Sequence, residues 1–184
     1  MIHSTMFYST SDCKRTPDVL YMTPHVVCLE DDGLCEDAGF DNQTEYKAVD
    51  CVSDQYTHAA EIFGEVPYVL TDVFNDSNCE RYKGSLAHRA DGDCLVLGGQ
   101  TSEIVVMHTN GSATLKTFMP GRGCDNQDLV SEVLIDVNYF ENSFCGMGGF
   151  VFYNNAYPGK LTRSRSSGSS SGFSRQAPST DAAQ

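Results

Sequence analysis

Long apolar runs and basic residues are both scarce in this chain of 184 residues. No apolar run approaches the roughly 20 residues that a membrane-spanning helix requires, so we expect no direct membrane insertion of the chain. Only 12 Lys and Arg residues stand against 25 Asp and Glu residues, and the formal net charge is −13. Because phosphate contacts require clustered Lys and Arg, we expect no nucleic-acid partner. The same acidity disfavours docking to anionic lipid.

Catalytic and metal-binding motifs are also missing. The sequence contains no G-x-S-x-G, H-E-x-x-H or P-loop pattern. The acidic stretch at residues 30–37 lacks the order of oxygen ligands in an EF-hand, and a solvated loop is the better interpretation than a Ca²⁺ site. We therefore predict no enzyme, no catalytic residue, no cofactor and no bound metal. The five histidines are His3, His25, His58, His88 and His108. Among them, His108 is expected to pack on the apolar side of a hairpin.

Cysteine, in contrast, is plentiful and evenly spread. The eight residues are Cys13, Cys28, Cys35, Cys51, Cys79, Cys94, Cys124 and Cys145. An even, dispersed set favours four disulfides, for which 105 connectivities exist. Metal ligation and free thiols are the competing hypotheses, but the C-x2-C pairs that structural zinc prefers are absent.

Disulfides require an oxidising compartment, so we expect an extracellular or cell-surface location. The first residues contain no signal-peptide pattern. We interpret the start of the chain as truncated or processed.

Three segments share a short pattern of an aromatic residue, a turn-forming stretch and a cysteine, followed by a second cysteine. They lie at residues 7–13, 73–79 and 117–124, and the second cysteine follows at Cys28, Cys94 and Cys145. The pattern predicts internal repeats with units near residues 7–51, 73–109 and 112–155, although chance similarity is an alternative.

If the repeats are stapled internally, the pairs are Cys13–Cys28, Cys79–Cys94, Cys124–Cys145 and, by remainder, Cys35–Cys51. Closing a loop of about 15 residues stabilises the fold by about 3 kcal/mol. Pairing between units is the open alternative, because equivalent positions do not require partners within one unit.

Short β-prone runs dominate the remaining pattern. The strongest is a hairpin over residues 103–118, where Asn110-Gly111 favours a two-residue type I′ turn that sets Val106 opposite Leu115 and Ile104 opposite Thr117. Other strands are expected at residues 24–30, 45–51, 68–74, 94–97, 129–140 and 149–153. One helix is expected over residues 53–63, with Ser53 as its N-cap and Gly64 after its end.

The predicted fold class is mainly β. We expect a small disulfide-stapled β-sandwich or tandem β modules, with at most one short helix and a disordered C-terminal tail.

The chain divides into two parts by composition. Residues 1–159 carry 8 basic and 24 acidic residues and form the cysteine-rich β domain. Residues 160–184 are rich in Ser, Gly and Arg, and this composition predicts a disordered linker or tail because it buries too little apolar surface. An O-glycosylated stalk, a phosphorylated segment and a splicing-type fragment are further interpretations of the tail.

Three asparagines fit the N-glycosylation pattern N-x-[ST], namely Asn42, Asn75 and Asn110. Asn110 falls at the tip of the predicted hairpin and Asn75 in a predicted turn, where a glycan would remain in solvent. Ordinary turn asparagines are the alternative interpretation.

The two best-matched segments, Phe-Tyr-Ser-Thr-Ser-Asp-Cys and Phe-Asn-Asp-Ser-Asn-Cys, each precede a cysteine fifteen positions later. In this they resemble the repeat units of cysteine-rich secreted or surface proteins of oomycete-like eukaryotic microbes. The resemblance covers about residues 7–145 and implies an extracellular ectodomain. It transfers no catalytic residue, and the extra Cys35 departs from its pattern.

We predict a non-enzymatic extracellular recognition, adhesion or cell-envelope module, as a fragment of a surface-protein ectodomain. Its partner would be a protein or glycan ligand that the sequence does not identify. The alternatives are a secreted effector or enzyme inhibitor, and a small secreted hydrolase.

Overall fold

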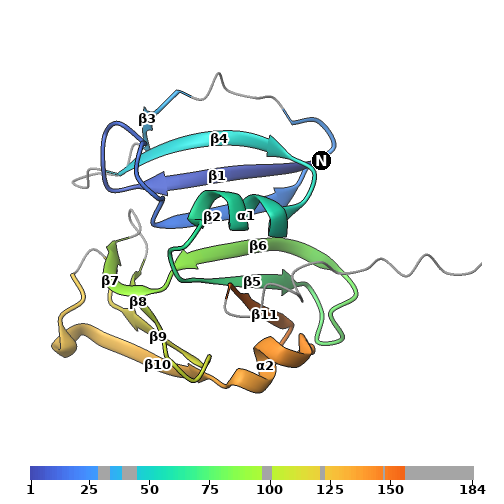
Figure 1. Ribbon diagram of the computed structural model, residues 1–184, viewed down its shortest axis with the longest axis vertical. Coiled ribbons are helices and arrows are strands. Elements are labelled where there is room, and N and C mark those ends of the chain that lie inside the picture. The colour runs from blue at the N-terminus through green and yellow to red at the C-terminus, as the bar shows by residue number, and fades with distance from the viewer. Residues whose placement is uncertain (29–33, 39–44, 97–100, 121–122, 147, 156–184) are drawn as a thin grey trace, which may run out of the picture.

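The computed structural model contains two antiparallel sheets, and the predicted mainly β fold is confirmed (Figure 1). The described residues are 1–28, 34–38, 45–96, 101–120, 123–146 and 148–155. Asn42, residues 30–33 of the acidic stretch and the predicted tail lie outside them. Within them, no helix is long and apolar enough to cross a membrane.

The larger sheet has seven strands in the order β11-β5-β6-β2-β1-β4-β3. Their bounds are β1 Ile2–Tyr8, β2 Val19–Pro24, β3 Glu36–Asp37, β4 Tyr46–Val52, β5 Tyr68–Phe74, β6 Tyr82–Arg89 and β11 Phe150–Asn154. All neighbouring strands in this sheet run antiparallel. Because successive side chains of a strand point to opposite faces, each long strand contributes to two different surfaces.

Helix α1 (Gln55–Phe63) covers one face of this sheet (Figure 1). Tyr56, Ala59 and Phe63 of the helix pack on the larger hydrophobic core. The strands supply to this core Met6, Tyr8, Leu20, Met22, Ala48, Tyr68, Leu70, Ala87, Val151 and Tyr153. Alternate residues of β5, such as Val69, belong instead to a second core on the opposite face. Strand β5 is therefore apolar on both faces, as a strand between two layers must be.

The smaller sheet has four strands in the order β10-β9-β8-β7. Their bounds are β7 Asp91–Val96, β8 Ser102–Met107, β9 Ala113–Phe118 and β10 Leu129–Ile135. The chain passes between the sheets at Ala90, whose N–H donates to the Pro67 carbonyl and whose carbonyl accepts from the Met107 N–H. The second core joins residues of both sheets. The two sheets therefore pack face to face over β5, β6 and β11.

The predicted hairpin forms, but its register differs by one residue. The loop holds three residues instead of two and ends at Gly111, whose φ of 84° is in the left-handed region. A three-residue loop with glycine at this position is a common hairpin connection. As a result Val105, and not Val106, lies opposite Leu115.

This shift exchanges the two faces of β8 relative to β9. Val105 is buried in the second core, whereas Ile104 pairs with Lys116 instead of Thr117. His108 lies beyond the end of β8 and is exposed, with its Nε2 2.8 Å from the Thr114 hydroxyl. The expectation of a packed core histidine at this position is therefore wrong.

Several predicted boundaries also need correction. The second strand of the sheet ends at Pro24 instead of beginning there. The strand predicted over residues 129–140 ends at Ile135, because Asp136 caps a second short helix, α2 (Val137–Asn142), by accepting from the Asn138 N–H. A single 3-10 turn, η1 (Asn126–Asp128), precedes β10. Strand β6 was not predicted, since its residues do not alternate between apolar and polar.

The predicted helix is confirmed with a different cap. Helix α1 begins one residue later than the capping pattern suggested, because the side chain of Asp54, and not Ser53, accepts from the Thr57 N–H at 2.8 Å. Gly64 follows the helix, as predicted, with a φ of 54°.

All eight cysteines form disulfides, but none of the predicted pairs occurs. The observed pairs are Cys13–Cys35, Cys28–Cys51, Cys79–Cys145 and Cys94–Cys124. In the predicted pair Cys13–Cys28, strand β2 leads the chain away from Cys13, and Cys28 follows the end of β2 at Pro24 too closely for the chain to return. A strand of six residues holds its ends roughly 20 Å apart, whereas the bonded Cα atoms lie only 5.6 to 5.8 Å apart.

The first two repeat segments occupy similar places in the sheet. Cys13 lies in the loop of the β1–β2 hairpin and Cys79 in the loop of the β5–β6 hairpin. Both have a positive φ, of 48° and 55°. Each N–H donates to the carbonyl three residues earlier, at 3.4 Å. Cys124 follows β9 and is not among the positive-φ residues. The three-unit repeat stays a prediction.

Candidate functional site, an apolar cavity between the sheets

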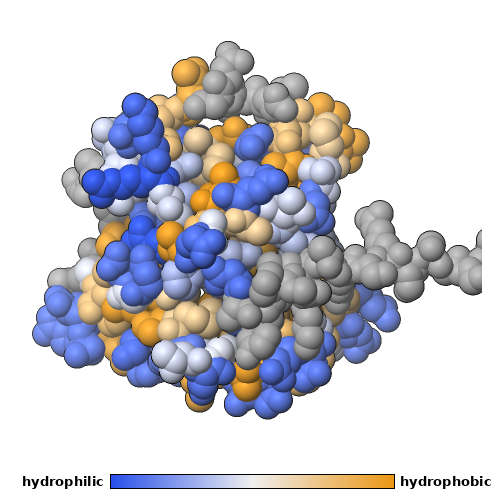
Figure 2. Space-filling model, in the orientation of Figure 1, coloured by the Kyte–Doolittle hydropathy of each residue, from blue (hydrophilic) through white to orange (hydrophobic). Residues whose placement is uncertain are grey.

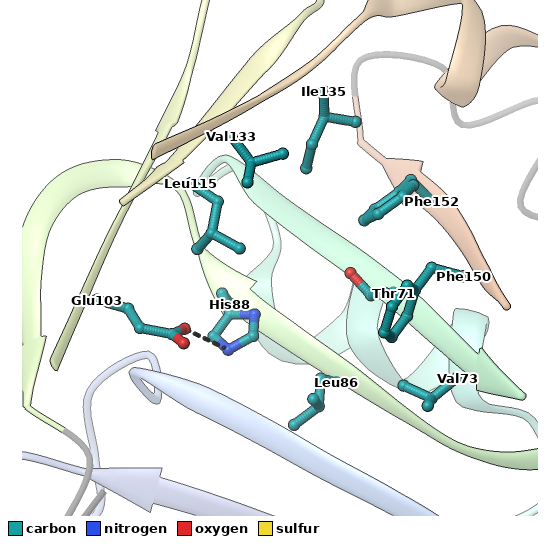
Figure 3. Close-up of a pocket in the computed structure, with 10 residues that line it drawn as sticks. All are labelled: Thr71, Val73, Leu86, His88, Glu103, Leu115, Val133, Ile135, Phe150 and Phe152. Carbon is teal, nitrogen blue, oxygen red and sulfur yellow. Dashed lines mark ion pairs between the residues drawn. The ribbon is translucent and has the colours of Figure 1, made fainter. Parts of the chain in front are cut away.

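A cavity of about 320 Å³ lies between the two sheets (Figure 3). This volume is near the lower end of the range for small-molecule sites, roughly 300–1,000 Å³. The larger sheet lines it with Thr71, Val73, Leu86, His88, Phe150 and Phe152. The smaller sheet lines it with Glu103, Leu115, Val133 and Ile135.

Strand alternation places these side chains on one surface. Thr71 and Val73 of β5, and Leu86 and His88 of β6, are two residues apart, so each pair points to the face away from α1. On β10, Val133 and Ile135 point inward. Between them Leu134 points outward and is 61% exposed. The cavity is therefore produced by the sheet pattern and not by a loop.

One ion pair forms the polar end of this cavity. His88 Nε2 lies 3.1 Å from Glu103 Oε2, and both side chains are largely buried. Figure 3 shows the pair at one end and Val73 and Phe150 at the other. An elongated ligand would thus meet one polar and one apolar end.

A second polar pair lies under α1. Ser4 Oγ is 3.0 Å from His58 Nε2, and the two residues are 0% and 5% exposed. Burial lowers the pKa of His58, although Asp50 and Glu61 act in the opposite direction. A serine and a histidine in contact are the usual start of a hydrolytic site. Here the hydroxyl is buried in the sheet, so a substrate has no access to it.

A third polar group surrounds Asp72, which is 1% exposed. Its Oδ2 accepts from the Tyr56 hydroxyl and its Oδ1 from the Ser85 hydroxyl, both at 2.5 Å. Tyr82 Oη lies 2.6 Å from the Ser85 hydroxyl. Burial and the Asp72 charge raise the pKa of Tyr56 above its ordinary value. Because each polar atom is bonded to protein, we assign this network to the core and not to a site.

The other predicted site residues lie away from the cavity. The eight cysteines are all consumed by disulfides, which excludes the free-thiol and cysteine-metal hypotheses. Among the described residues, no cluster of three His, Cys, Asp or Glu side chains is arranged to hold a metal ion. Asn75 is exposed in the β5–β6 loop and Asn110 at the tip of the β8–β9 hairpin. The glycosylation of both stays a prediction.

None of the cavity residues was predicted from the sequence. All of them except Leu86 and His88 were in predicted strands, but no local pattern shows which face of a strand borders a cavity. His88 and Glu103 lie on different sheets, so only their tertiary packing brings them together. The sequence offered one indication: a strand with apolar residues on both faces, such as β5, is typical of a strand that is covered by other elements on both sides.

The outer surface of the molecule does not indicate a second candidate site. Figure 2 shows that hydrophilic residues cover much of this face, while apolar residues are visible at its upper edge and also in its lower half. The exposed apolar residues near the N-terminal half are Met1, Tyr21, Val26, Val27 and Leu34.

Comparison with protein-family models, curated proteins and solved structures finds no match for this chain. The resemblance to cysteine-rich microbial repeat proteins therefore stays a prediction.

Proposed function

We propose that this chain is a non-enzymatic extracellular recognition module that binds a small apolar molecule between its two sheets. The cavity beside β5 carries the proposal, because most of its lining is apolar and its polar groups are few, namely the His88–Glu103 pair at one end and Thr71. Ligand sites for small molecules have this composition, with few polar groups that set orientation. The ligand class thus differs from the protein or glycan partner that the sequence suggested.

The extracellular part of the proposal is supported by the disulfides. Four disulfides in a chain of this size are typical of extracellular proteins. N-glycans at Asn75 and Asn110 are compatible with ligand binding, since neither residue lines the cavity. A recognition role agrees with the buried Ser4–His58 pair, whose hydroxyl is inaccessible.

The test is saturable binding of a neutral apolar dye, N-phenyl-naphthylamine, followed by its fluorescence. Val133→Trp fills the cavity from β10, and Leu134→Trp adds the same side chain on the outer face of that strand. The natural chain contains no Trp, so each variant carries a single tryptophan signal. We expect the natural chain and Leu134→Trp to bind the dye equally, and Val133→Trp to bind it roughly tenfold or more weakly.

Thermal unfolding of both variants separates lost binding from lost folding, and Val133→Phe is the smaller filling change if the tryptophan is not tolerated. Equal dye affinity in all folded variants would place binding elsewhere and contradict the proposal. Absence of saturable binding by the natural chain would contradict it as well.

A further inference from the structure

We propose that the ligand of the cavity is a long-chain apolar molecule whose outer part lies on the open half of the larger sheet. The proposal rests on the proposed function and adds the length of the ligand and a second contact surface, with Tyr21 at its border. It follows from the register of the larger sheet, in which one row of side chains runs from inside the cavity to the outside.

One row of side chains crosses the larger sheet on the face that borders the cavity. Side chains directly opposite each other on paired antiparallel strands lie on the same face, with their Cβ atoms about 5 Å apart. In the order β11, β5, β6, β2, β1 and β4, the row consists of Phe152, Thr71, Leu86, Tyr21, Thr5 and Val49. The first three members line the cavity. The same surface therefore continues outward from the cavity.

The smaller sheet covers only the inner half of this row. Figure 1 shows β2, β1 and β4 beyond the edge of the smaller sheet. The core that the two sheets share takes residues from β5 and β11 of the larger sheet, and none from the described parts of β2, β1 and β4. Leu86 is the last cavity residue of the row, and Tyr21, the next along, is 42% exposed. The cavity thus borders on an open sheet face between Leu86 and Tyr21.

The open half offers mainly apolar contacts to a ligand that leaves the cavity. Tyr21 presents an aromatic ring, which provides a large contact area. Thr5, Phe7 and Val49 lie on the same face and are each partly exposed. On β6, Gly84 presents no side chain toward this face, which leaves space for a chain to pass from the cavity onto β2. The row itself contains no charged residue, so its outer part suits a hydrocarbon chain.

The spacing of the strands gives the length of chain that each half accommodates. Neighbouring strands lie about 4.8 Å apart, so the inner half from β11 to β6 spans about 10 Å, and the distance from β6 to β1 adds about 10 Å more. An extended hydrocarbon chain advances about 1.25 Å per carbon–carbon bond. Laid along the row, octanol therefore stays within the cavity, whereas tetradecanol passes Leu86 and reaches over Tyr21.

The experiment compares octanol, dodecanol and tetradecanol, which share one head group and differ in chain length. Displacement of bound N-phenyl-naphthylamine from the disulfide-bonded full chain gives the affinities, with each alcohol kept below its solubility limit. Tyr21→Ser removes the ring at the border of the cavity. We expect it to weaken tetradecanol binding about fivefold or more and octanol binding less than about twofold. Tyr21→Phe keeps the ring and should leave both affinities within about twofold of those of the natural chain.

Leu134→Ser is the matched control, because Leu134 is also an exposed apolar residue within a strand but lies on the outside of the smaller sheet. It should leave all three affinities unchanged, and thermal unfolding shows whether each variant is folded. An NMR titration of the natural chain needs no variant. Tetradecanol should shift the methyl signals of Val49, and octanol should not.

Three results would overturn the long-chain proposal: equal weakening of octanol and tetradecanol by Tyr21→Ser, no weakening of tetradecanol in the folded variant, or unshifted Val49 methyls at saturating tetradecanol. In each case the dye and octanol would still bind the natural chain, so the proposed function would stand. Failure of the dye and of all three alcohols to bind the natural chain would overturn the proposed function itself.

Discussion

At the scale of single residues, the core contains two tyrosines in opposite situations. The hydroxyl of Tyr56 donates to Asp72 at 2.5 Å. The hydroxyl of Tyr68 is buried and has no hydrogen-bond partner among the described residues. Removing a bonded group and removing an unbonded one have opposite consequences for stability.

We expect Tyr68→Phe to leave the free energy of unfolding unchanged or to raise it by about 1 kcal/mol, since it removes a desolvated hydroxyl that makes no bond. Tyr56→Phe should lower it by about 2–3 kcal/mol, because one oxygen of Asp72 then loses its donor. Urea unfolding of both variants measures the two effects. A larger loss in Tyr68→Phe than in Tyr56→Phe would contradict these assignments.

Two tyrosines that are wholly or partly buried, Tyr68 and Tyr82, predict an alkaline limit to stability. Burial raises the pKa of Tyr68 and of Tyr82 to about 12, while an unfolded tyrosine titrates near pH 10. Between about pH 10 and 12 the unfolded state has lost a proton that the folded state retains, so the free energy of unfolding falls as pH rises. Below about pH 10 the contribution of these groups is constant.

Denaturant unfolding at about pH 8, 10 and 11.5 checks this expectation. Tyr68→Phe, which lacks one of the two groups, should lose less stability across this interval than the natural chain. A stability that is flat or rising above pH 10 would be incompatible with buried, neutral tyrosines.

At the scale of helices and strands, the elements that local sequence patterns determine could be predicted, and those that depend on tertiary packing could not. Strand β5 was predicted with its observed bounds, and α1 with nearly its observed bounds, because an apolar run and a capped segment are local signals. The β8–β9 hairpin was predicted from Asn-Gly, but its register depends on how the loop packs and was off by one residue. The short helix α2 was not predicted, because its first residues belong to an apolar run that is typical of a strand.

One turn between α2 and β11 depends on close contact with another element. Gly149 has a φ of 106°, and a Cβ there would lie 2.7 Å from the Asp76 carbonyl oxygen. Its neighbour Gly148 has a φ of 82° and open space around it. The positive φ disfavours any residue with a Cβ at both positions. Only at Gly149 would that Cβ also clash with the β5–β6 loop.

We therefore expect Gly148→Ala to destabilise the fold by about 1–2 kcal/mol, the usual cost of a left-handed residue with a Cβ. Gly149→Ala should cost more, about 3 kcal/mol or above, since backbone must also move. Thermal unfolding of the two variants gives the comparison. Equal losses would show that the contact with Asp76 has no energetic effect.

At the scale of the whole molecule, the disulfides connect parts that the strands separate. Cys79–Cys145 joins residues 66 positions apart, and Cys13–Cys35 joins residues 22 positions apart. The sequence predicted that every cysteine pairs, because an even, dispersed set is typical of this chemistry. It could not predict the partners, because partners are set by which segments the tertiary fold brings together, and Cys51 and Cys94 lie within strands.

The loop lengths predict unequal contributions to stability. In the chain-entropy description, a disulfide stabilises more when it closes a longer loop. Replacing both cysteines of Cys79–Cys145 by Ser should cost about 1 kcal/mol more than the same change at Cys13–Cys35. Urea unfolding of the two double variants measures the difference, and peptide mapping without reduction verifies the remaining pairs. A larger loss at Cys13–Cys35 would indicate that local packing outweighs loop length.

The most direct test of ligand binding between the sheets is an NMR titration of methyl groups with dodecanol. Val133 and Ile135 face the cavity and Leu134 faces solvent on the same strand, so the three methyl-bearing residues form an internal comparison. We predict saturable shifts at Val133, Ile135 and Leu115, with little change at Leu134. Unshifted cavity methyls at saturating dodecanol, or shifts centred on Leu134, would contradict a binding site between the sheets.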